Sequence, residues 1–196
     1  MKPDTIVLAT RNPHKAAEMK ALLAGLPVTV RDLSEFPGCP DVEEDGDTLE
    51  DNAYKKAEAA YRCTGLPAVA DDTGLEVYYL LGQPGVYSAR YAGENATYEE
   101  NCKKLLQELT QVPARKRDAR FRCVIALVGP GTEEYFEGRV EGRILLTPRG
   151  SGGFGYDPVF QAEGFTRSFA ELTAEEKNAV SHRGNALRAL KEFLAK

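Results

Sequence analysis

The sequence lacks the features that mark several common classes of protein. The 196-residue chain has four cysteines, at positions 39, 63, 102 and 123, and no CxxC pair. This spacing favours a reducing compartment over disulfides or a zinc site. No apolar run approaches the roughly 20 residues needed to cross a bilayer, and the N-terminus lacks the long apolar core of a signal peptide. We therefore expect a soluble, cytoplasmic protein with no membrane partner.

The chain also has no excess of positive charge. Its net charge is −5, with acidic and basic residues interspersed, which argues against nucleic acid as a partner. The one basic run, Arg115 to Arg117, precedes a predicted strand and is interpreted as a solvated connector. The length fits one domain, or one domain with a smaller lobe. We find no Ser-His-Asp arrangement with a persuasive nucleophile.

The most informative stretch runs from Leu66 to Leu75, where a short apolar segment ends in Asp71 and Asp72. We expect a strand with the two acids at its carboxyl end, where ligands collect in α/β sheets. Charges at the edge of a core persist only when they are paired, hydrogen-bonded or metal-bound, so the two acids are candidate metal ligands or a general base. Neighbouring strand residues point to opposite faces, so one of the two is expected to face the site. The alternative is an ordinary turn at residues 72–74.

The N-terminal segment predicts a strand, a loop and a helix. Residues 5–9 are apolar, Asn12 suits a helix N-cap, and Pro13 suits the first helical position. Free backbone N–H groups at such a helix start form a ready anion site, and Lys15 adds a cation there. The alternative is an ordinary turn between strand and helix, since the spacing of a Walker loop is absent.

A loop rich in acidic residues, Ser34 to Asp47, precedes the next predicted helix; we call it the acidic loop. Such a cluster is usually solvated. However, Thr48 begins a capping-box pattern that ties the loop to a helix ending near Cys63, so a carboxylate of the loop could help bind Mg²⁺. Lys55 and Lys56 on that helix are either exposed or able to reach a phosphate.

The second half of the chain predicts a different arrangement. Residues 119–128 and 134–146 are expected to form a long antiparallel hairpin across a Gly-Pro-Gly turn. A helix that starts at the Thr97 capping box looks structural. Parallel units followed by a long hairpin predict an α/β fold with a mixed sheet and a second lobe.

The stretch from Ser151 to Pro158 has the composition of a purine site. Its glycines allow close backbone approach, Phe154 and Tyr156 offer flat rings, and Asp157 offers an acceptor. The alternative is a bulged turn with its rings packed inward. Farther on, Lys177 and Arg183 could neutralise phosphates, and His182 could donate to a ligand or lie at the surface near a helix end.

Four motifs together resemble the inosine/xanthosine triphosphate pyrophosphatase family, also called Ham1-like. They are TRNPHK at residues 10–15, DDTG at 71–74, FGYD at 154–157 and SHR at 181–183. The resemblance extends over nearly the whole chain. It implies a single domain, residues 1–196, with two lobes around a long mixed sheet flanked by helices, a nucleotide site in the cleft between the lobes, and a homodimer. It also implies Mg²⁺-dependent hydrolysis of ITP, dITP and XTP to monophosphate and pyrophosphate, which cleanses the nucleotide pool.

The resemblance assigns roles residue by residue. Asp72 matches the proton acceptor and a metal ligand, and Glu43 aligns best with the second acidic ligand, although adjacent Glu44 also remains possible. Two departures from the family pattern are Arg11, where Gly is frequent, and Thr73, where Ser is frequent. The residues implied to bind substrate are Thr10, Arg11, Asn12, Pro13, His14, Lys15, Lys56, Thr73, Phe154, Gly155, Tyr156, Asp157, Lys177, His182 and Arg183.

The residues suit the chemistry that the resemblance implies. Mg²⁺ held by Glu43 and Asp72 would stabilise charge on the phosphates, while Asp72 orients or deprotonates the attacking water. Two rival functions remain. One is a phosphatase of the haloacid-dehalogenase type, although the spacer of its DxDx[TV] motif is absent at residues 71–73. The other is a nucleotide-binding regulatory module without turnover.

Overall fold

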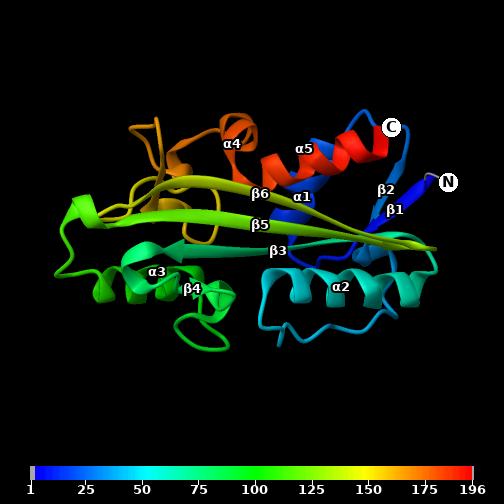
Figure 1. Ribbon diagram of the computed structural model, residues 1–196, viewed down its shortest axis with the longest axis horizontal. Helices are drawn as coiled ribbons and strands as arrows, with labels where there is room; N and C mark the ends of the chain where they lie inside the picture. Colours follow the sequence, from blue (N-terminus) through cyan, green and yellow to red (C-terminus); the bar gives the residue numbers. More distant parts are fainter. Residues whose placement is uncertain (1–2, 196) are drawn as a thin grey trace. The chain divides into compact units, whose positions relative to one another are not determined.

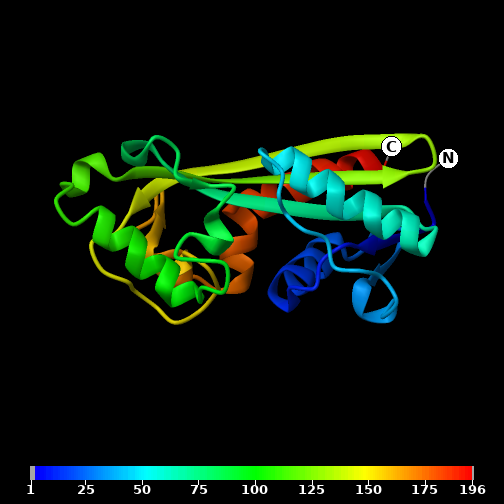
Figure 2. The same ribbon diagram turned by 90° about the horizontal axis from the view of Figure 1, so that it is seen from below.

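The computed structural model describes residues 3–195 of the chain, which form two compact units. Unit 1 comprises the chain up to Asp72, the segment Cys123–Gly138 and the chain from Arg183 onward; unit 2 comprises Thr73–Arg122 and Arg139–His182. Both units mix helices and strands (Figure 1; Figure 2), which confirms the predicted α/β class.

The strands of the described residues form a mixed sheet, as predicted. Its order is β2-β1-β3-β5-β6-β7, and β4 pairs with β3. The pairs β1–β2 and β1–β3 are parallel, whereas β3–β4 and β6–β7 are antiparallel. The strand bounds are β1 Thr5–Leu8, β2 Thr29–Asp32, β3 Ala68–Val77, β4 Pro84–Gly85, β5 Asp118–Gly129, β6 Thr132–Ile144 and β7 Phe160–Ala162.

Unit 1 packs three helices against its strands. The apolar residues of α1 (Pro13–Leu23) and α5 (His182–Ala195) share one core with β1, β3 and β5. In Figure 1, α5 lies above β3 and β5, and α2 (Leu49–Thr64) lies below them. Small buried residues, Ala53, Ala57 and Ala60, are on α2, so the helix can approach its neighbours closely.

A disulfide corrects the expectation that all four cysteines are reduced thiols. Cys39 of the acidic loop is bonded to Cys63 near the end of α2, and their Cα atoms are 5.7 Å apart. One cysteine is in the acidic loop and the other is on α2. They are 24 residues apart in sequence, so their spacing alone does not predict that they are bonded. Cys102 and Cys123 are buried thiols outside this disulfide.

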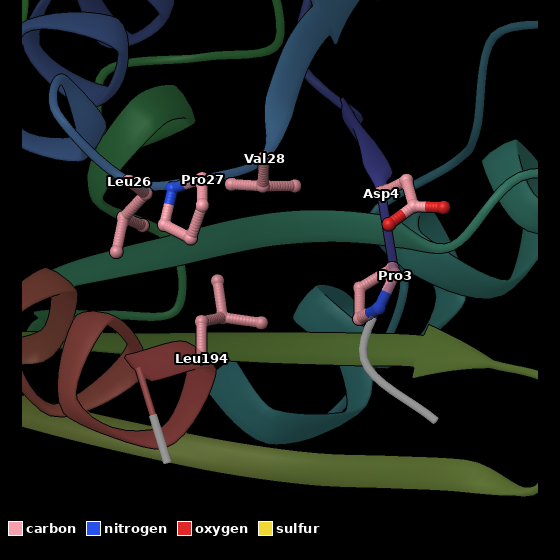
Figure 3. Close-up of a pocket in the computed structure, with 6 residues that line it drawn as sticks. All are labelled: Pro3, Asp4, Leu26, Pro27, Val28 and Leu194. Carbon is pink, nitrogen blue, oxygen red and sulfur yellow. The ribbon is translucent and has the colours of Figure 1, made fainter.

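A small cavity in unit 1 opens near the start of β1. Its lining is mostly aliphatic: Pro3, Asp4, Leu26, Pro27, Val28 and Leu194 (Figure 3). No residue predicted to bind substrate lines this cavity. An apolar lining of this kind does not suit a triphosphate, so the candidate site lies elsewhere.

Unit 2 surrounds its own aromatic core. Phe121 of β5 packs edge-on against Phe160 of β7, with ring centroids 4.7 Å apart, and Phe169 lies against both rings. The helix α3 (Tyr98–Glu108) begins at the Thr97 capping box as predicted, and α4 (Ala174–Val180) begins at a similar box on Thr173. Among the described residues, no helix is both long and apolar enough to span a membrane.

One predicted strand boundary is wrong. Asp71 and Asp72 lie in the middle of β3, a ten-residue strand, and not at its carboxyl end. The strand continues because Leu75 and Glu76 pair with β4. Gly74 lets β4 approach, since a Cβ there would lie 2.8 Å from the carbonyl oxygen of Gly85. The acids are therefore held by a regular strand and not by a turn.

Candidate active site

Two adjacent carboxylates on β3 have different partners. Asp71 is 1 % exposed and Asp72 is 5 % exposed, so each is removed from bulk water. Asp71 contacts Lys15 and Arg183, whereas Asp72 contacts Lys56. This difference agrees with the alternation of side chains along a strand.

Asp71 is surrounded by cations. Arg183 donates to its Oδ2 from Nη2 at 2.8 Å and from Nε at 3.2 Å, and the Nζ of Lys15 lies 3.2 Å from the same oxygen. Burial raises the pKa of Asp71, but Lys15 and Arg183 outweigh it and hold the pKa well below its ordinary value. Asp71 is therefore ionised at neutral pH.

Asp72 lies in a less compensated environment. Lys56 Nζ is 3.4 Å from its Oδ1, and its buried Oδ2 has no hydrogen-bond partner among residues 3–195. Burial raises the pKa of Asp72; Lys56 and Lys15 oppose this effect, and the nearby charges of Glu44 and Asp71 add to it. A buried carboxylate oxygen of this kind can accept a proton or a cation.

The segment of residues 10–15 forms the predicted helix start. The Asn12 side chain accepts from the backbone N–H groups of His14 and Lys15 at 3.0 and 3.3 Å, which confirms Asn12 as the N-cap and Pro13 as the first helical residue. Thr10 Oγ1 accepts from the N–H of Asn12 at 3.2 Å. The side chain of Lys15, on the first turn of α1, is directed to Asp71.

The acidic loop brings Glu44 to the same region. Glu44 Oε1 accepts from Lys56 Nζ at 3.0 Å, and that lysine also contacts Asp72. Glu43 is exposed. No three His, Cys, Asp or Glu side chains within the described part of the chain form a ready-made metal cluster. Asp72 and Glu44 nevertheless fit a hard divalent cation, because both supply carboxylate oxygens and one oxygen of Asp72 has no hydrogen bond.

In unit 2, a buried ion pair organises the FGYD stretch. Lys177 Nζ donates to Asp157 Oδ2 at 2.7 Å, and the same oxygen accepts from the backbone N–H of Phe154 at 2.8 Å. Lys177 also lies 4.6 Å from the centroid of the Phe154 ring. Gly153 has φ +69°, and a Cβ on it would lie 2.1 Å from Asp157 Oδ2. Only glycine fits at this position.

The remaining predicted residues have mixed environments. The Tyr156 hydroxyl donates to the carbonyl of Ser88 at 2.9 Å, so this ring packs inward. His182 is 3 % exposed and stacks on Phe121 with ring centroids 4.6 Å apart; it is not a surface residue. Gly155 has φ +62°, and Thr73 is half-buried on β3. Arg183 lies in unit 1 with Asp71, although its neighbour His182 belongs to unit 2.

Two residues of these networks were not predicted from the sequence. Glu18 accepts from Arg183 Nη1 at 2.6 Å, and Gly153 leaves the space that Asp157 fills. Glu18 lies three residues after Lys15 on α1, and that spacing puts both side chains on one helix face. That spacing was the available signal for Glu18, whereas nothing in the local sequence distinguished Gly153 from its neighbouring glycines.

The comparisons with known proteins agree with this geometry. The sequence profile of the Ham1 family matches residues 6–193. The chain belongs to the Ham1 family. A dITP/XTP pyrophosphatase of Geobacter sulfurreducens is 57% identical to it over 190 residues, which are 96% of each protein. A dITP/XTP pyrophosphatase of Thermoanaerobacter sp. is 52% identical and covers 97% of this chain and 96% of its own.

Solved Ham1 structures have the same fold. A HAM1 protein from Coxiella burnetii superposes with a TM-score of 0.89 at 46% identity, and covers 97% of this chain and 98% of its own. The Ham1 protein of Staphylococcus aureus gives a TM-score of 0.87 at 42% identity, with the same coverage. The family resemblance drawn from the four sequence motifs is therefore confirmed.

Proposed function

We propose that this Ham1 chain hydrolyses dITP, ITP and XTP to the nucleoside monophosphate and pyrophosphate, and thereby removes non-standard purines from the nucleotide pool. The relatives named dITP/XTP pyrophosphatase support this proposal. The observation that supports it most strongly is that the two carboxylates on β3 have different environments. Cations hold Asp71 ionised, while Asp72 keeps one buried oxygen without a hydrogen bond.

The triphosphate binds to unit 1 in this proposal. The N-terminus of α1 offers backbone N–H groups and a positive dipole end, and Lys15 and Lys56 supply two cations whose charge is shared with Asp71 and Asp72. The binding loop also includes Thr10, Arg11, Pro13 and His14, with Asn12 as its N-cap. A nucleotide phosphate would exchange these internal ion pairs for contacts with its own oxygens.

Mg²⁺ is the metal that we propose. Asp72 and Glu44 would hold it, with Glu44 in place of Glu43 because Glu44 contacts the lysine that reaches Asp72. When bound there, Mg²⁺ would supply positive charge next to the phosphate oxygens. Both proposed ligands supply carboxylate oxygens, which suit Mg²⁺ better than softer metals.

Asp72 is the proposed general base. Its raised pKa, caused first by burial, brings its basicity closer to that useful for accepting a proton from water near neutral pH. Lys56 keeps the carboxylate oriented through its Oδ1 and leaves Oδ2 available for the water that attacks the α-phosphorus. The bond to the β-phosphate oxygen then breaks, and pyrophosphate leaves.

The purine binds to unit 2 in this proposal. Phe154 supplies a flat ring, and the pair of Lys177 and Asp157 supplies a donor and an acceptor fixed by burial. A 6-oxo purine accepts from such donors, whereas adenine presents its own amino group and leaves them unpaired. Discrimination of this kind reaches on the order of 10⁴ where a site is built around the hydrogen bond. Guanine also has a 6-oxo group, so its rejection has to depend on its 2-amino group.

The decisive assay incubates the purified chain with Mg²⁺ and dITP, ITP, XTP, ATP or GTP, and measures pyrophosphate and orthophosphate separately. We expect pyrophosphate from the first three substrates and very little product from ATP or GTP, with loss of turnover when EDTA removes the metal. Orthophosphate would instead favour a phosphatase. Tight ITP binding without any product would favour a regulatory module.

A homodimer is part of the same proposal. Four large apolar side chains are exposed within a short segment of unit 2: Tyr78, Tyr79, Leu81 and Tyr87. Exposed apolar side chains gathered in this way favour association, and a second copy of the chain is the proposed partner. Light scattering should give twice the mass of 21.5 kDa, and Leu81→Asp should yield the monomer if this segment lies in the interface. Because its substrates belong to the nucleotide pool, we propose that the enzyme acts in the cytoplasm.

A further inference from the structure

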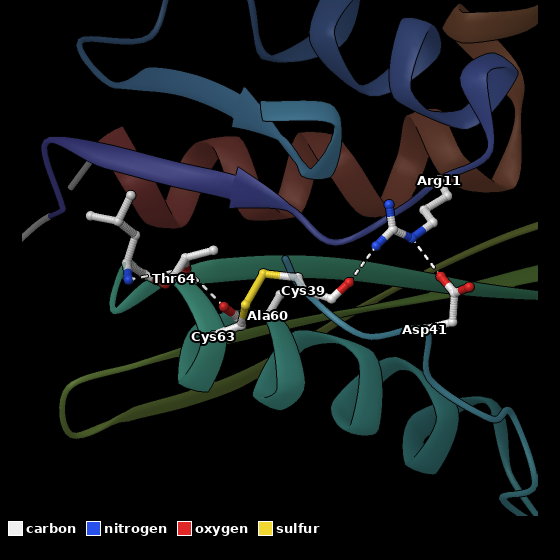
Figure 4. Close-up of a disulfide and its surroundings, with 7 residues drawn as sticks. Arg11, Cys39, Asp41, Ala60, Cys63 and Thr64 are labelled. Carbon is white, nitrogen blue, oxygen red and sulfur yellow. Dashed lines mark hydrogen bonds and ion pairs between the residues drawn. A yellow bond between two sulfur atoms is a disulfide. The ribbon is translucent and has the colours of Figure 1, made fainter. Parts of the chain in front are cut away.

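The disulfide of unit 1 connects two segments of the candidate site. Cys39 belongs to the acidic loop, and Cys63 lies on the last turn of α2, the helix that also bears Lys56 (Figure 4). Seven residues, about two helical turns, separate Lys56 from Cys63, so both side chains leave the helix on the same side. The bond therefore fixes the acidic loop to the face of α2 that reaches Asp72.

Cys39 also contacts the loop of residues 10–15, which is proposed to bind phosphate. Its carbonyl oxygen accepts from Arg11 Nη2 at 2.6 Å, and Arg11 Nε lies 2.5 Å from Asp41 Oδ1 (Figure 4). A single residue thus links α2 through its sulfur and the loop of residues 10–15 through its carbonyl. Movement of Cys39 would change the position of the Arg11 side chain.

The acidic loop has three further attachments to the same helix, one of which is a hydrogen bond of 2.8 Å from the backbone N–H of Gly46 to the Asn52 side chain. Glu44 contacts Lys56 at 3.0 Å, and Asp45 contacts Lys55 at 2.6 Å. The Asp45–Lys55 pair is exposed on both sides and holds the loop weakly on its own, whereas in the Glu44–Lys56 pair the lysine side chain is 12% exposed and the glutamate 37%. The disulfide at Cys39 is the one covalent attachment among these contacts.

We propose that Cys39 and Cys63 form a reversible redox clamp that controls the order of the acidic loop and, through it, the metal and phosphate contacts of the site. Cys39 is 6 % exposed, whereas Cys63 is an exposed residue, so a reductant would approach the bond from the side of Cys63. Disulfides with an exposed sulfur are the ones typically used for regulation.

The Cys39–Cys63 bond forms by thiol–disulfide exchange, and the oxidant is a low-molecular-weight disulfide such as oxidised glutathione. A glutathione disulfide accepts two electrons from the Cys39 and Cys63 thiols, the Sγ–Sγ bond forms, and two glutathione thiols leave with the two protons. In the reverse direction, a thiolate attacks the Sγ of Cys63, the Sγ–Sγ bond breaks, and Cys39 leaves as a thiolate that takes up a proton. A second thiol resolves the mixed disulfide on Cys63.

Reduction is expected to loosen the acidic loop without unfolding unit 1. Glu44 would then meet Lys56 and Asp72 less often, so the Mg²⁺ concentration for half-maximal hydrolysis should rise about fivefold, at the low end of ordinary coupling between sites. This effect on hydrolysis rests on the proposed function. The effect on loop order does not.

The test compares the full chain equilibrated with oxidised glutathione and with dithiothreitol. Alkylation followed by peptide mass spectrometry reports the thiol state of Cys39 and Cys63, and hydrogen–deuterium exchange reports the order of residues 36–47. On reduction, exchange of that segment should become about tenfold faster, as expected when a locally closed segment opens more often. In the double variant Cys39→Ser/Cys63→Ser, exchange should be fast in both conditions, while Cys123→Ala should respond like the unchanged chain.

The outcomes separate this proposal from the proposed function. Free thiols at Cys39 and Cys63 after incubation with oxidised glutathione would overturn the clamp, as would exchange that is equal in the two redox states. If the segment responds but the chain hydrolyses no nucleotide in either state, the clamp stands and the proposed hydrolase function fails.

Discussion

The buried contact between Arg183 and Asp71 should make a large contribution to stability. Arg183 is 1 % exposed and donates to Asp71 and Glu18 through three of its nitrogens. Arg183→Met keeps an unbranched apolar stem at this position but removes the guanidinium group and all of these bonds. Breaking one side of a buried pair costs about 3–5 kcal/mol because a charge is left uncompensated.

We expect Arg183→Met to lower the free energy of unfolding by an amount at the lower end of that range, about 3 kcal/mol. Lys15 would remain 3.2 Å from Asp71, and the side chain of Glu18 is 17% exposed and can be hydrated. The free energy of unfolding is measured by urea denaturation at pH 7. The matched control is Arg62→Met, which removes an exposed pair with Glu58 on α2 and should change stability by less than about 0.5 kcal/mol.

The pH dependence supplies a second check on the same pair. The pKa of folded Asp71 is held below its ordinary value of 3.8 by Lys15 and Arg183 against the effect of burial. The unfolded chain therefore binds a proton at Asp71 before the folded chain does, and this stabilisation is complete above about pH 5 and declines as the pH falls below about 4. The stability difference between the unchanged chain and Arg183→Met should shrink over that interval.

Two results would refute this reasoning. One is an Arg183→Met variant whose loss of unfolding free energy equals that of Arg62→Met, since burial would then have no consequence. The other is a stability difference that stays constant from pH 6 to pH 3, since the contact would then not depend on the charge of Asp71.

Three further predictions concern other parts of the chain. Gly153→Ala should lower thermal stability and weaken ITP binding more than Gly155→Ala. Both glycines have positive φ, but only at Gly153 would the new Cβ meet Asp157 Oδ2, at 2.1 Å. Equal losses in the two variants would contradict this steric argument. Asp72→Asn should abolish hydrolysis while leaving ITP binding within about tenfold, because it removes charge more than shape; near-normal turnover would disprove the assignment of Asp72 as the base. The carboxyl of Asp32 should titrate by NMR with a pKa of about 2, lowered mainly by Lys20 and then by Ser34. Lys20→Met should raise that pKa toward 3.8, and an unchanged midpoint would show that Lys20 is not the cause.

Several parts of the fold could be predicted because their causes are local. Asn12 caps α1, Thr48 caps α2 and Thr97 caps α3, each through bonds to residues only two or three positions away. The hairpin of β5 and β6 likewise follows from an apolar strand, a Gly-Pro-Gly turn and a second strand. A local pattern is sufficient when the interacting atoms are neighbours along the chain.

Within the candidate site, the sequence determined which residue types are present but not their partners. The adjacent carboxylates of Asp71 and Asp72 were evident, as was an acidic ligand at either Glu43 or Glu44. Only the fold decided that Asp71 pairs with Arg183, 112 residues away, and that Glu44 contacts Lys56. Long-range pairs depend on how helices pack on the sheet, and no local pattern encodes that packing.

The disulfide is a second long-range contact that could not be predicted from the sequence. Their spacing along the chain predicted reduced thiols, yet the acidic loop runs back along α2 and brings the Cα atoms of Cys39 and Cys63 within 5.7 Å. Sequence separation is a poor guide to distance when a helix and a loop run side by side. Local chemistry thus determined the elements and the acidic, basic and aromatic residues of the site, whereas tertiary packing decided which charges are compensated, which carboxylate oxygen has no hydrogen bond, and which sulfurs meet.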